Sequence, residues 1–139
     1  MQVKEIMTKN CTYVSPDTTF QEAAKIMRDK DLGSLPVGEN DRLVGLITDR
    51  DIVVRTLANG KDINTAKVKD AMTPHCLYCF EEDTIEEASK NMGKNKVRRL
   101  TVLNSDKRLV GIISLGDIAR KGSNQTAGGA LEAISQKTK

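Results

Sequence analysis

The chain is poor in aromatic residues, with no tryptophan, two tyrosines and two phenylalanines among 139 residues. A hydrophobic core must therefore be aliphatic, and the row of stacked aromatics that binds single-stranded nucleic acid is excluded. No apolar run approaches the ~18 residues of a membrane span, and the N-terminus lacks the apolar stretch of a signal peptide. These absences predict a cytoplasmic protein that does not cross a membrane.

The chain also lacks a large excess of one charge. Its net charge is only +3, although 29% of the residues are charged, and the two signs are interspersed. This balance argues against a general nucleic-acid-binding surface, but a local basic cluster can still hold phosphates.

Cysteine and histidine are scarce, with three cysteines and a single histidine. An odd number of cysteines without an export signal predicts reduced thiols. The motif His75-Cys76-x-x-Cys79 resembles part of a zinc site, but zinc needs a fourth ligand. Cys79 also aligns with Val14 in a strand-like segment, where a thiol packs as a small apolar group. Ordinary packing is therefore favoured over metal or redox chemistry, and no metal site is predicted.

The chain contains an internal repeat. With an offset of 65 residues, Val3-Lys4-Glu5-Ile6-Met7-Thr8 aligns with Val68-Lys69-Asp70-Ala71-Met72-Thr73. One extra residue then enters the second copy, and at an offset of 66 Arg42–Thr48 aligns with Arg108–Ser114. Each copy is too short to bury much apolar surface alone, so we expect the two to share one core.

Each repeat has the pattern of a β-α-β-β-α unit. Alternation and apolar runs predict strands, and an i, i+3, i+4, i+7 apolar period predicts the first helix of each copy. Thr18-x-x-Gln21 and Thr84-x-x-Glu87 are typical of capping boxes that start these helices. The expected strands are 12–14, 34–37 and 43–47 in the first copy and 77–79, 100–103 and 109–113 in the second. The expected second helices run from Asp49 to about Ala58 and from Leu115 to about Lys121.

These elements predict the organisation of the chain. The first repeat covers residues 1–60, a connection covers 61–67, and the second repeat covers 68–121. Residues 122–139 belong to neither repeat. We expect them to form a flexible or partner-contacting tail, in which Ala130, Leu131 and Ile134 would make one or two amphipathic turns.

The end of each third strand carries a repeated polar motif. Gly45-x-x-Thr48-x-x-Asp51 is echoed by Gly111-x-x-Ser114-x-x-Asp117. The hydroxyl and carboxylate can simply cap the following helix, although aspartate is short for a capping box. Alternatively, the hydroxyl and exposed N–H groups bind a phosphate while the carboxylate accepts from ribose hydroxyls. The glycine suggests close approach of a ligand to the backbone. Spacing alone leaves the two interpretations open.

The layout resembles a tandem pair of cystathionine-β-synthase (CBS) domains, the Bateman module. The resemblance rests on Ile6-Met7-Thr8, Glu22-Ala23-Ala24-x-x-Met27, Leu35-Pro36-Val37 and Val44–Ile52, and on Val97–Val102 and Val110–Ile118 in the second copy. It covers residues 1 to about 121. It implies an α/β (α+β) fold whose two repeats pack sheet to sheet about a pseudo-two-fold axis. It also implies two clefts that bind adenosine-containing ligands such as AMP, ADP, ATP or S-adenosylmethionine.

The resemblance also implies which residues form each cleft. The first cleft would combine Thr48, Arg50 and Asp51 with Leu77, Tyr78, Ala88, Val97, Arg98 and Arg99. The second would combine Ile112, Ser114 and Asp117 with Thr12, Val14, Ser15, Ala23, Gly33 and Ser34. Arg98 and Arg99 can instead be a solvated basic edge, and Tyr13 and Tyr78 can be packing residues.

The second repeat departs from the pattern. Leu115-Gly116 replaces Asp49-Arg50, which removes a basic residue beside the expected phosphate position. Thr101 also replaces the proline seen at Pro36. We therefore expect the Asp51 cleft to favour ADP or ATP, and the Asp117 cleft to tolerate AMP or a ligand with little phosphate charge.

The sequence thus predicts a non-enzymatic regulatory module that binds an adenine nucleotide and signals through a change in conformation or assembly, as a homodimer or with a protein partner. Three rival hypotheses remain: an enzyme acting on the nucleotide, a nucleic-acid-linked regulator, and a structural dimer with degenerate clefts. The clefts offer no histidine, metal cluster or activated nucleophile pair, which argues against the enzyme.

Overall fold

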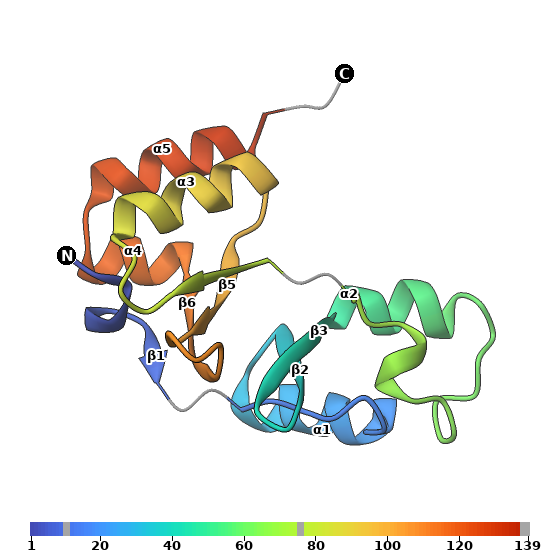
Figure 1. The fold of residues 1–139 in the computed structure, drawn as a ribbon. Helices are drawn as coiled ribbons and strands as arrows, with labels where there is room; N and C mark the ends of the chain where they lie inside the picture. The colour runs from blue at the N-terminus through green and yellow to red at the C-terminus, as the bar shows by residue number, and fades with distance from the viewer. Residues whose placement is uncertain (10–11, 75–76, 137–139) are drawn as a thin grey trace. The chain divides into compact units, whose positions relative to one another are not determined.

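A computed structural model describes residues 1–9, 12–74 and 77–136 (Figure 1). The chain divides into two compact units. The first, here called the repeat-1 unit, is residues 12–76, and the second, the repeat-2 unit, is residues 1–11 together with 77–139. The mixed α/β composition of both units confirms the predicted fold class.

The repeat-1 unit is built on a hairpin. Strands β2 (Ser34–Glu39) and β3 (Arg42–Thr48) pair antiparallel around a turn in which Asn40 and Asp41 have φ of 54° and 62°. Such a pair of positive φ values is typical of the tight turns that match strand twist. The predicted first strand is reduced to a single parallel bridge between Val14 and Val37.

Two helical segments complete the repeat-1 unit. Helix α1 (Phe20–Lys30) places Phe20, Ala23 and Met27 in the core, as the apolar period predicted. After β3 the chain continues as α2 (Asp49–Asp51), which passes directly into a π-helix, Ile52–Leu57. The 3-10 turn Val68–Asp70, later in the chain, also belongs to this unit. The core consists of Val14, Phe20, Ala23, Met27, Leu35, Val37, Ile47, Val68 and Ala71.

The repeat-2 unit contains a four-stranded sheet in the order β1-β6-β5-β4. Strands β4 (Tyr78–Phe80) and β5 (Arg99–Leu103) are parallel, whereas β5 and β6 (Leu109–Ser114), and β6 and β1 (Thr8–Lys9), are antiparallel. Helices α3 (Ile85–Asn95) and α4 (Leu115–Lys121) follow β4 and β6. The core consists of Val3, Ile6, Met7, Cys79, Ile85, Ala88, Met92, Leu100, Val102, Ile113, Ile118 and Ala127.

The first helix of each unit starts with a threonine cap. Thr84 Oγ1 accepts from the N–H of Glu87 at 3.1 Å, which confirms the threonine half of the predicted capping box. In the first repeat the cap is Thr19, which accepts from the N–H of Glu22 at 3.2 Å, one residue after the predicted Thr18. Thr18 instead accepts from the N–H of Ser15 at 3.0 Å, because it closes the turn that precedes the helix.

The segment that opens each repeat in the sequence packs on the unit of the other repeat. Residues 1–9, including the turn Val3–Glu5 and β1, lie in the repeat-2 unit, and the Val68–Asp70 turn lies in the repeat-1 unit. The compact units therefore differ from the predicted division at residues 60 and 67. Sequence self-alignment finds where a motif recurs, but not which sheet completes its hydrogen bonds.

This packing of each opening segment on the unit of the other repeat explains why the glycines at 45 and 111 recur. An added Cβ at Gly111 would lie 2.5 Å from the carbonyl oxygen of Thr8, and one at Gly45 would lie 3.0 Å from that of Thr73. Met7 and Met72 would also lie within 3 Å of these added atoms. The close approach that the sequence suggested is thus made by the chain's own Met-Thr segments rather than by a ligand.

The C-terminal segment also differs from the expected tail. Residues Asn124–Ile134 form a helix, α5, that packs against α3 and α4 (Figure 1). Ser123 caps it by accepting from the N–H of Thr126 at 3.2 Å, and Ala127 and Ala130 are buried. Its apolar positions are mostly alanine, so its periodicity is too weak in the sequence to predict a full-length helix.

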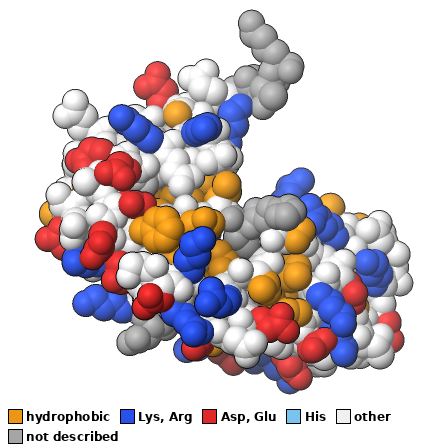
Figure 2. All heavy atoms as spheres, viewed as in Figure 1, with side chains coloured by type: hydrophobic (Ala, Val, Ile, Leu, Met, Phe, Trp, Pro, Cys, Tyr) orange, Lys and Arg blue, Asp and Glu red, His pale blue; other side chains and the backbone are white. Residues whose placement is uncertain are grey.

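The surface agrees with the balanced composition, since acidic and basic side chains are interspersed over the face shown in Figure 2. In the part of the chain that the structure describes, no helix is long and apolar enough to cross a membrane.

Candidate functional site

The third strand of each unit ends in a complete capping box. In the repeat-1 unit the N–H of Asp51 donates to Thr48 Oγ1, and the N–H of Thr48 donates to Asp51 Oδ2, both at 3.0 Å. In the repeat-2 unit Asp117 and Ser114 make the same two bonds at 3.0 and 2.9 Å. The expectation that aspartate reaches back poorly is wrong, because the carboxylate closes both boxes. These residues therefore have a structural role.

The N–H groups at the helix starts are mostly occupied. The N–H of Asp49 donates to the carbonyl of Gly33 at 3.0 Å, and that of Arg50 to Asp49 Oδ1 at 2.8 Å. In the second repeat the N–H of Leu115 donates to the carbonyl of Arg98 at 2.9 Å. The N–H groups expected to bind an anion are thus largely satisfied within the chain. Phosphate recognition has to rest on side-chain cations instead.

The two aspartates keep one oxygen available beyond the cap. Asp51 Oδ1 lies 3.7 Å from Arg55 Nε, and Asp117 Oδ1 accepts from Arg120 Nη2 at 2.9 Å. Each carboxylate oxygen has two acceptor positions, so Oδ1 can also accept from a ligand hydroxyl. Asp117 is buried, with 5% of its surface exposed, whereas Asp51 is half-buried. Both ends thus combine an oriented carboxylate with a nearby guanidinium.

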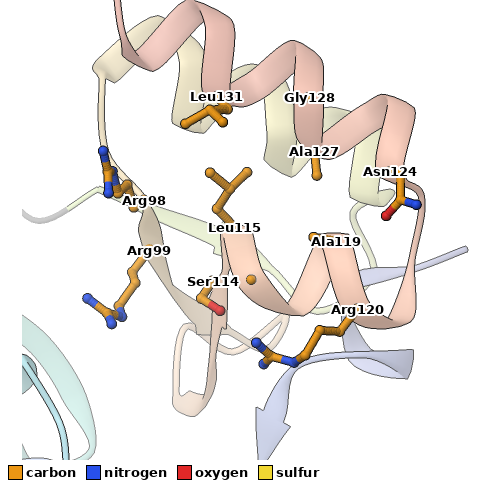
Figure 3. Close-up of a pocket in the computed structure, with 11 residues that line it drawn as sticks. Arg98, Arg99, Ser114, Leu115, Ala119, Arg120, Asn124, Ala127, Gly128 and Leu131 are labelled. Atoms are coloured by element: carbon orange, nitrogen blue, oxygen red, sulfur yellow. The ribbon is translucent and has the colours of Figure 1, made fainter.

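A pocket of about 630 Å³ opens beside the Ser114 end of the repeat-2 unit (Figure 3). Its volume falls within the range of small-molecule sites. Its lining combines Ser114 and three arginines with apolar side chains from α4 and α5. The lining residues are Arg98, Arg99, Ser114, Leu115, Gly116, Ala119, Arg120, Asn124, Ala127, Gly128 and Leu131.

The predicted residues are divided between the two units, so the clefts across repeats that the resemblance implies stay a prediction. In the repeat-1 unit Ser34 pairs with Thr48 in the β2–β3 register, and Gly33 bonds to Asp49. In the repeat-2 unit Arg99 pairs with Ser114 in the β5–β6 register. The first group comprises Thr12, Val14, Ser15, Ala23, Gly33, Ser34, Thr48, Arg50 and Asp51. The second comprises Leu77, Tyr78, Ala88, Val97, Arg98, Arg99, Ile112, Ser114 and Asp117.

Some of these residues have clear packing roles. Ala23 and Ala88 are fully buried in the cores of their units and offer no exposed surface to a ligand. Tyr78 is 39% exposed and packs edge-on against Phe80, with ring centroids 5.6 Å apart. The hydroxyl of Tyr13 donates to Asp41 at the hairpin turn. Arg98 and Arg99 are exposed, and neither guanidinium makes an ion pair within the described residues.

Arg120 is a site residue that the sequence interpretation missed. A Cβ added at Gly116 would lie 2.8 Å from Arg120 Nη1 and 3.6 Å from Ser114 Oγ, so the guanidinium lies against the backbone of Gly116. The guanidinium of Arg120 therefore takes the place of the basic residue that position 116 lacks. The signal in the sequence was an exchange between the repeats, where Arg50 and Val54 become Gly116 and Arg120.

Cys79 is the described member of the possible metal motif, whose other members, His75 and Cys76, lie outside the described residues. Cys79 is buried, and this burial, with the charge of Asp83 as a lesser cause, raises its pKa to about 12. A thiol that stays protonated is a poor metal ligand. Among the described residues no group of three or more histidine, cysteine or acidic side chains is placed to hold a metal ion.

Comparisons with known proteins give the same pattern of two repeats. The family model described as the CBS domain matches residues 3–56 and again residues 68–124. CBS domain-containing protein YhcV from Bacillus subtilis is 41% identical over 134 residues, which are 96% of this chain and 94% of that protein.

Solved structures agree with this assignment. The crystal structure of Hypoxic Response Protein I with two coordinated zinc ions has a TM-score of 0.80 and 39% identity, covering 87% of this chain and 98% of that one. The structure of CBSX2 in complex with AMP has a TM-score of 0.72 and 30% identity, covering 86% and 93%. This chain therefore belongs to the CBS domain family and carries two CBS domains in tandem.

Proposed function

We propose that this protein is a regulatory CBS pair that binds an adenosine-containing ligand and signals its occupancy through a change in conformation or assembly. The observation that carries the proposal is the pair of Ser/Thr-x-x-Asp ends. Each holds a carboxylate in a fixed orientation by its capping bonds and leaves Oδ1 able to accept from a ribose hydroxyl. The AMP complex of CBSX2 supports an adenosine ligand in general.

The roles of the site residues follow from their chemistry. Asp51 and Asp117 would accept from ribose hydroxyls, and Thr48 and Ser114 would contact ribose or phosphate. Arginines are suited to phosphate because their planar guanidinium donates two parallel hydrogen bonds. Arg50 would serve the first site. The resemblance assigns Arg98 and Arg99 to that site as well, but we propose them for the second, because Arg99 is the strand partner of Ser114 and both arginines line the pocket beside it. The resemblance adds contacts from the opposite repeat in each site, and AMP, ADP, ATP and S-adenosylmethionine are the candidate ligands.

The same groups favour binding over catalysis. The hydroxyls of Thr48 and Ser114 accept from backbone N–H groups, and their partner carboxylates are engaged in the caps. An activated nucleophile needs a base that takes its proton, and here the nearest carboxylate bonds to the backbone instead. We therefore propose a ligand sensor rather than an enzyme.

Self-association is the proposed output. Val53, Val54 and Leu57 on the π-helix are 54%, 46% and 62% exposed. The matching helix of the second repeat, α4, is covered by α5, whereas in the described part of the repeat-1 unit, residues 12–74, no such helix follows. Exposed aliphatic residues on one helix face fit a second copy of the chain in a symmetric dimer. Leu57→Glu should then lower the oligomer mass in sedimentation, whereas Lys121→Ala should not.

Native mass spectrometry of freshly purified protein tests ligand binding and assembly together. We expect a dimer mass that carries one or two retained adenosine ligands for each chain. A bare mass that stays unchanged after addition of AMP, ADP, ATP or S-adenosylmethionine would refute the ligand assignment. In that case a purely structural dimer, or binding to a nucleic acid with strong salt dependence, becomes the better interpretation.

A further inference from the structure

The two repeats place an arginine at different positions of the same helix. Arg50 and Val54 in the first repeat correspond to Gly116 and Arg120 in the second, at the offset of 66. Residues four apart lie one above the other on a helix face. The second repeat therefore carries its arginine one helical turn later than the first, and it has a glycine at the earlier position.

Glycine at position 116 leaves free the space that the Arg120 guanidinium occupies. The Cβ of any other residue at 116 would lie 2.8 Å from Nη1 and 3.7 Å from Cζ of Arg120. An alanine at this position would therefore require the end of the Arg120 side chain to shift. By contrast, Arg50 has its own side chain at the equivalent position, and no ion pair within the described residues holds its guanidinium.

Asp117 fixes the guanidinium from the other side. Arg120 Nη2 donates to Asp117 Oδ1 at 2.9 Å, while the same carboxylate caps the helix through Oδ2. A guanidinium has five N–H donors, so one bond to a carboxylate leaves Nη1 able to contact a second anion. In Figure 3 Arg120 and Arg99 lie to either side of Ser114, and Arg99 is the strand partner of Ser114.

We infer that Arg120, placed by the absence of a side chain at Gly116, is the phosphate-specificity residue of the Asp117 site. It supplies the cation that Leu115-Gly116 removes from the helix start. The inference rests on the proposed function, because it names the residue that selects phosphate-bearing ligands in that site. It also reverses the expectation that the Asp117 site tolerates ligands with little phosphate charge.

The test measures the ratio of ATP to adenosine affinity by calorimetry in an Asp51→Ala protein, where the proposal leaves only the Asp117 site. Arg120→Ala should weaken ATP binding about tenfold or more, as expected for the loss of a charge-assisted hydrogen bond. It should change adenosine binding by less than about threefold. Gly116→Ala, which keeps the arginine but displaces it, should weaken ATP binding in the same direction. Lys121→Ala on the same helix is the control and should leave both affinities unchanged.

The possible failures are distinguishable. An Arg120→Ala protein with an unchanged ATP-to-adenosine ratio overturns the inference alone. A Gly116→Ala protein that binds ATP like its parent shows that the glycine does not position Arg120. If the wild-type chain and the Asp51→Ala protein bind neither ligand, the inference fails, and the proposed function fails with it if AMP, ADP and S-adenosylmethionine do not bind either. Melting curves of each variant establish that a lost affinity reflects the site and not unfolding.

Discussion

At the scale of single residues, Asp51 and Asp117 combine two roles in one carboxylate. Oδ2 closes a capping box, and Oδ1 faces an arginine and can accept from a ligand. Capping and binding are therefore compatible, although the sequence presented them as alternatives. A fixed cap holds the carboxylate ready for a ligand, which lowers the ordering cost of binding.

Asp117→Ala should consequently affect both stability and binding. Loss of the bond from the N–H of Ser114 to Asp117 Oδ2 and of the ion pair with Arg120 should lower the free energy of unfolding by about 1 kcal/mol, and ligand affinity at this site should also fall. Asp117→Asn keeps an oxygen that can accept from the N–H of Ser114, so it should retain most of the stability. Urea unfolding of the two variants checks this difference. Equal losses of stability in both would contradict the assigned role of the capping bond.

Cys79 should make the stability of the fold dependent on alkaline pH. Burial raises its pKa from 9.0 to about 12, so the folded state favours the protonated thiol. The stabilisation is complete below pH 9, where the unfolded thiol is also protonated. It declines as the pH rises from 9 towards 12, because the unfolded state then loses its proton first.

The measurement is the difference in unfolding free energy between the wild-type protein and Cys79→Val from pH 8 to pH 10.5. Other groups titrate in this range, but they are common to both proteins and cancel in the difference. We expect the wild-type protein to lose stability relative to the variant above pH 9. A constant difference would show that Cys79 ionises as readily in the folded chain as in the unfolded one.

At the scale of elements, Gly45 and Gly111 leave room for the Met-Thr segments that pack against β3 and β6. A Cβ at Gly111 would lie 2.5 Å from the Thr8 carbonyl, which is backbone and cannot rotate away. Gly111→Ala should lower the unfolding free energy by about 1–3 kcal/mol, as other overpacked sites do.

Gly128 in α5 is the matched control, because an added Cβ there meets no atom within 4 Å. Gly128→Ala should raise stability by about 0.5–1 kcal/mol, since alanine favours the helix. Chemical denaturation of both variants gives the comparison. A harmless Gly111→Ala would mean that the β1–β6 pairing does not depend on this close approach.

Local patterns predicted most of the elements in each repeat. The apolar period of Phe20, Ala23 and Met27 is a property of neighbouring residues, and the helix follows it. The pairing of Thr8 with Ile112 joins residues far apart in the chain, so no local pattern contains it. The π-helix at Ile52–Leu57 escaped prediction because its apolar residues also fit an ordinary helix.

The same distinction explains the candidate site. Thr48, Asp51, Ser114 and Asp117 recur at fixed spacing, so the repeat identified them. Arg120 is placed by a glycine one turn before it and by an ion pair with Asp117, and both depend on side-chain geometry that a motif search does not contain. Arg120 departs from the repeat, so only its three-dimensional contacts identify it as a site residue.

At the scale of the whole molecule, each compact unit depends on a segment supplied from the other repeat's sequence. Residues 1–9 complete the sheet of the repeat-2 unit, and the Thr73–Leu46 bridge adds to the repeat-1 unit. Truncation at the predicted boundaries would remove one such segment from each half. The two CBS domains are therefore expected to fold and report on ligand as one chain.

The most direct test of the central claim is a calorimetric titration of the full chain with AMP, ADP, ATP and S-adenosylmethionine. The account predicts saturable binding of at least one of them, with one binding event lost in Asp117→Ala and the other in Asp51→Ala. It also predicts a melting shift of several degrees, because a ligand at 100 times its dissociation constant adds about 2.7 kcal/mol. No heat of binding and no melting shift with any of the four would contradict the assignment of a ligand-binding role to these ends.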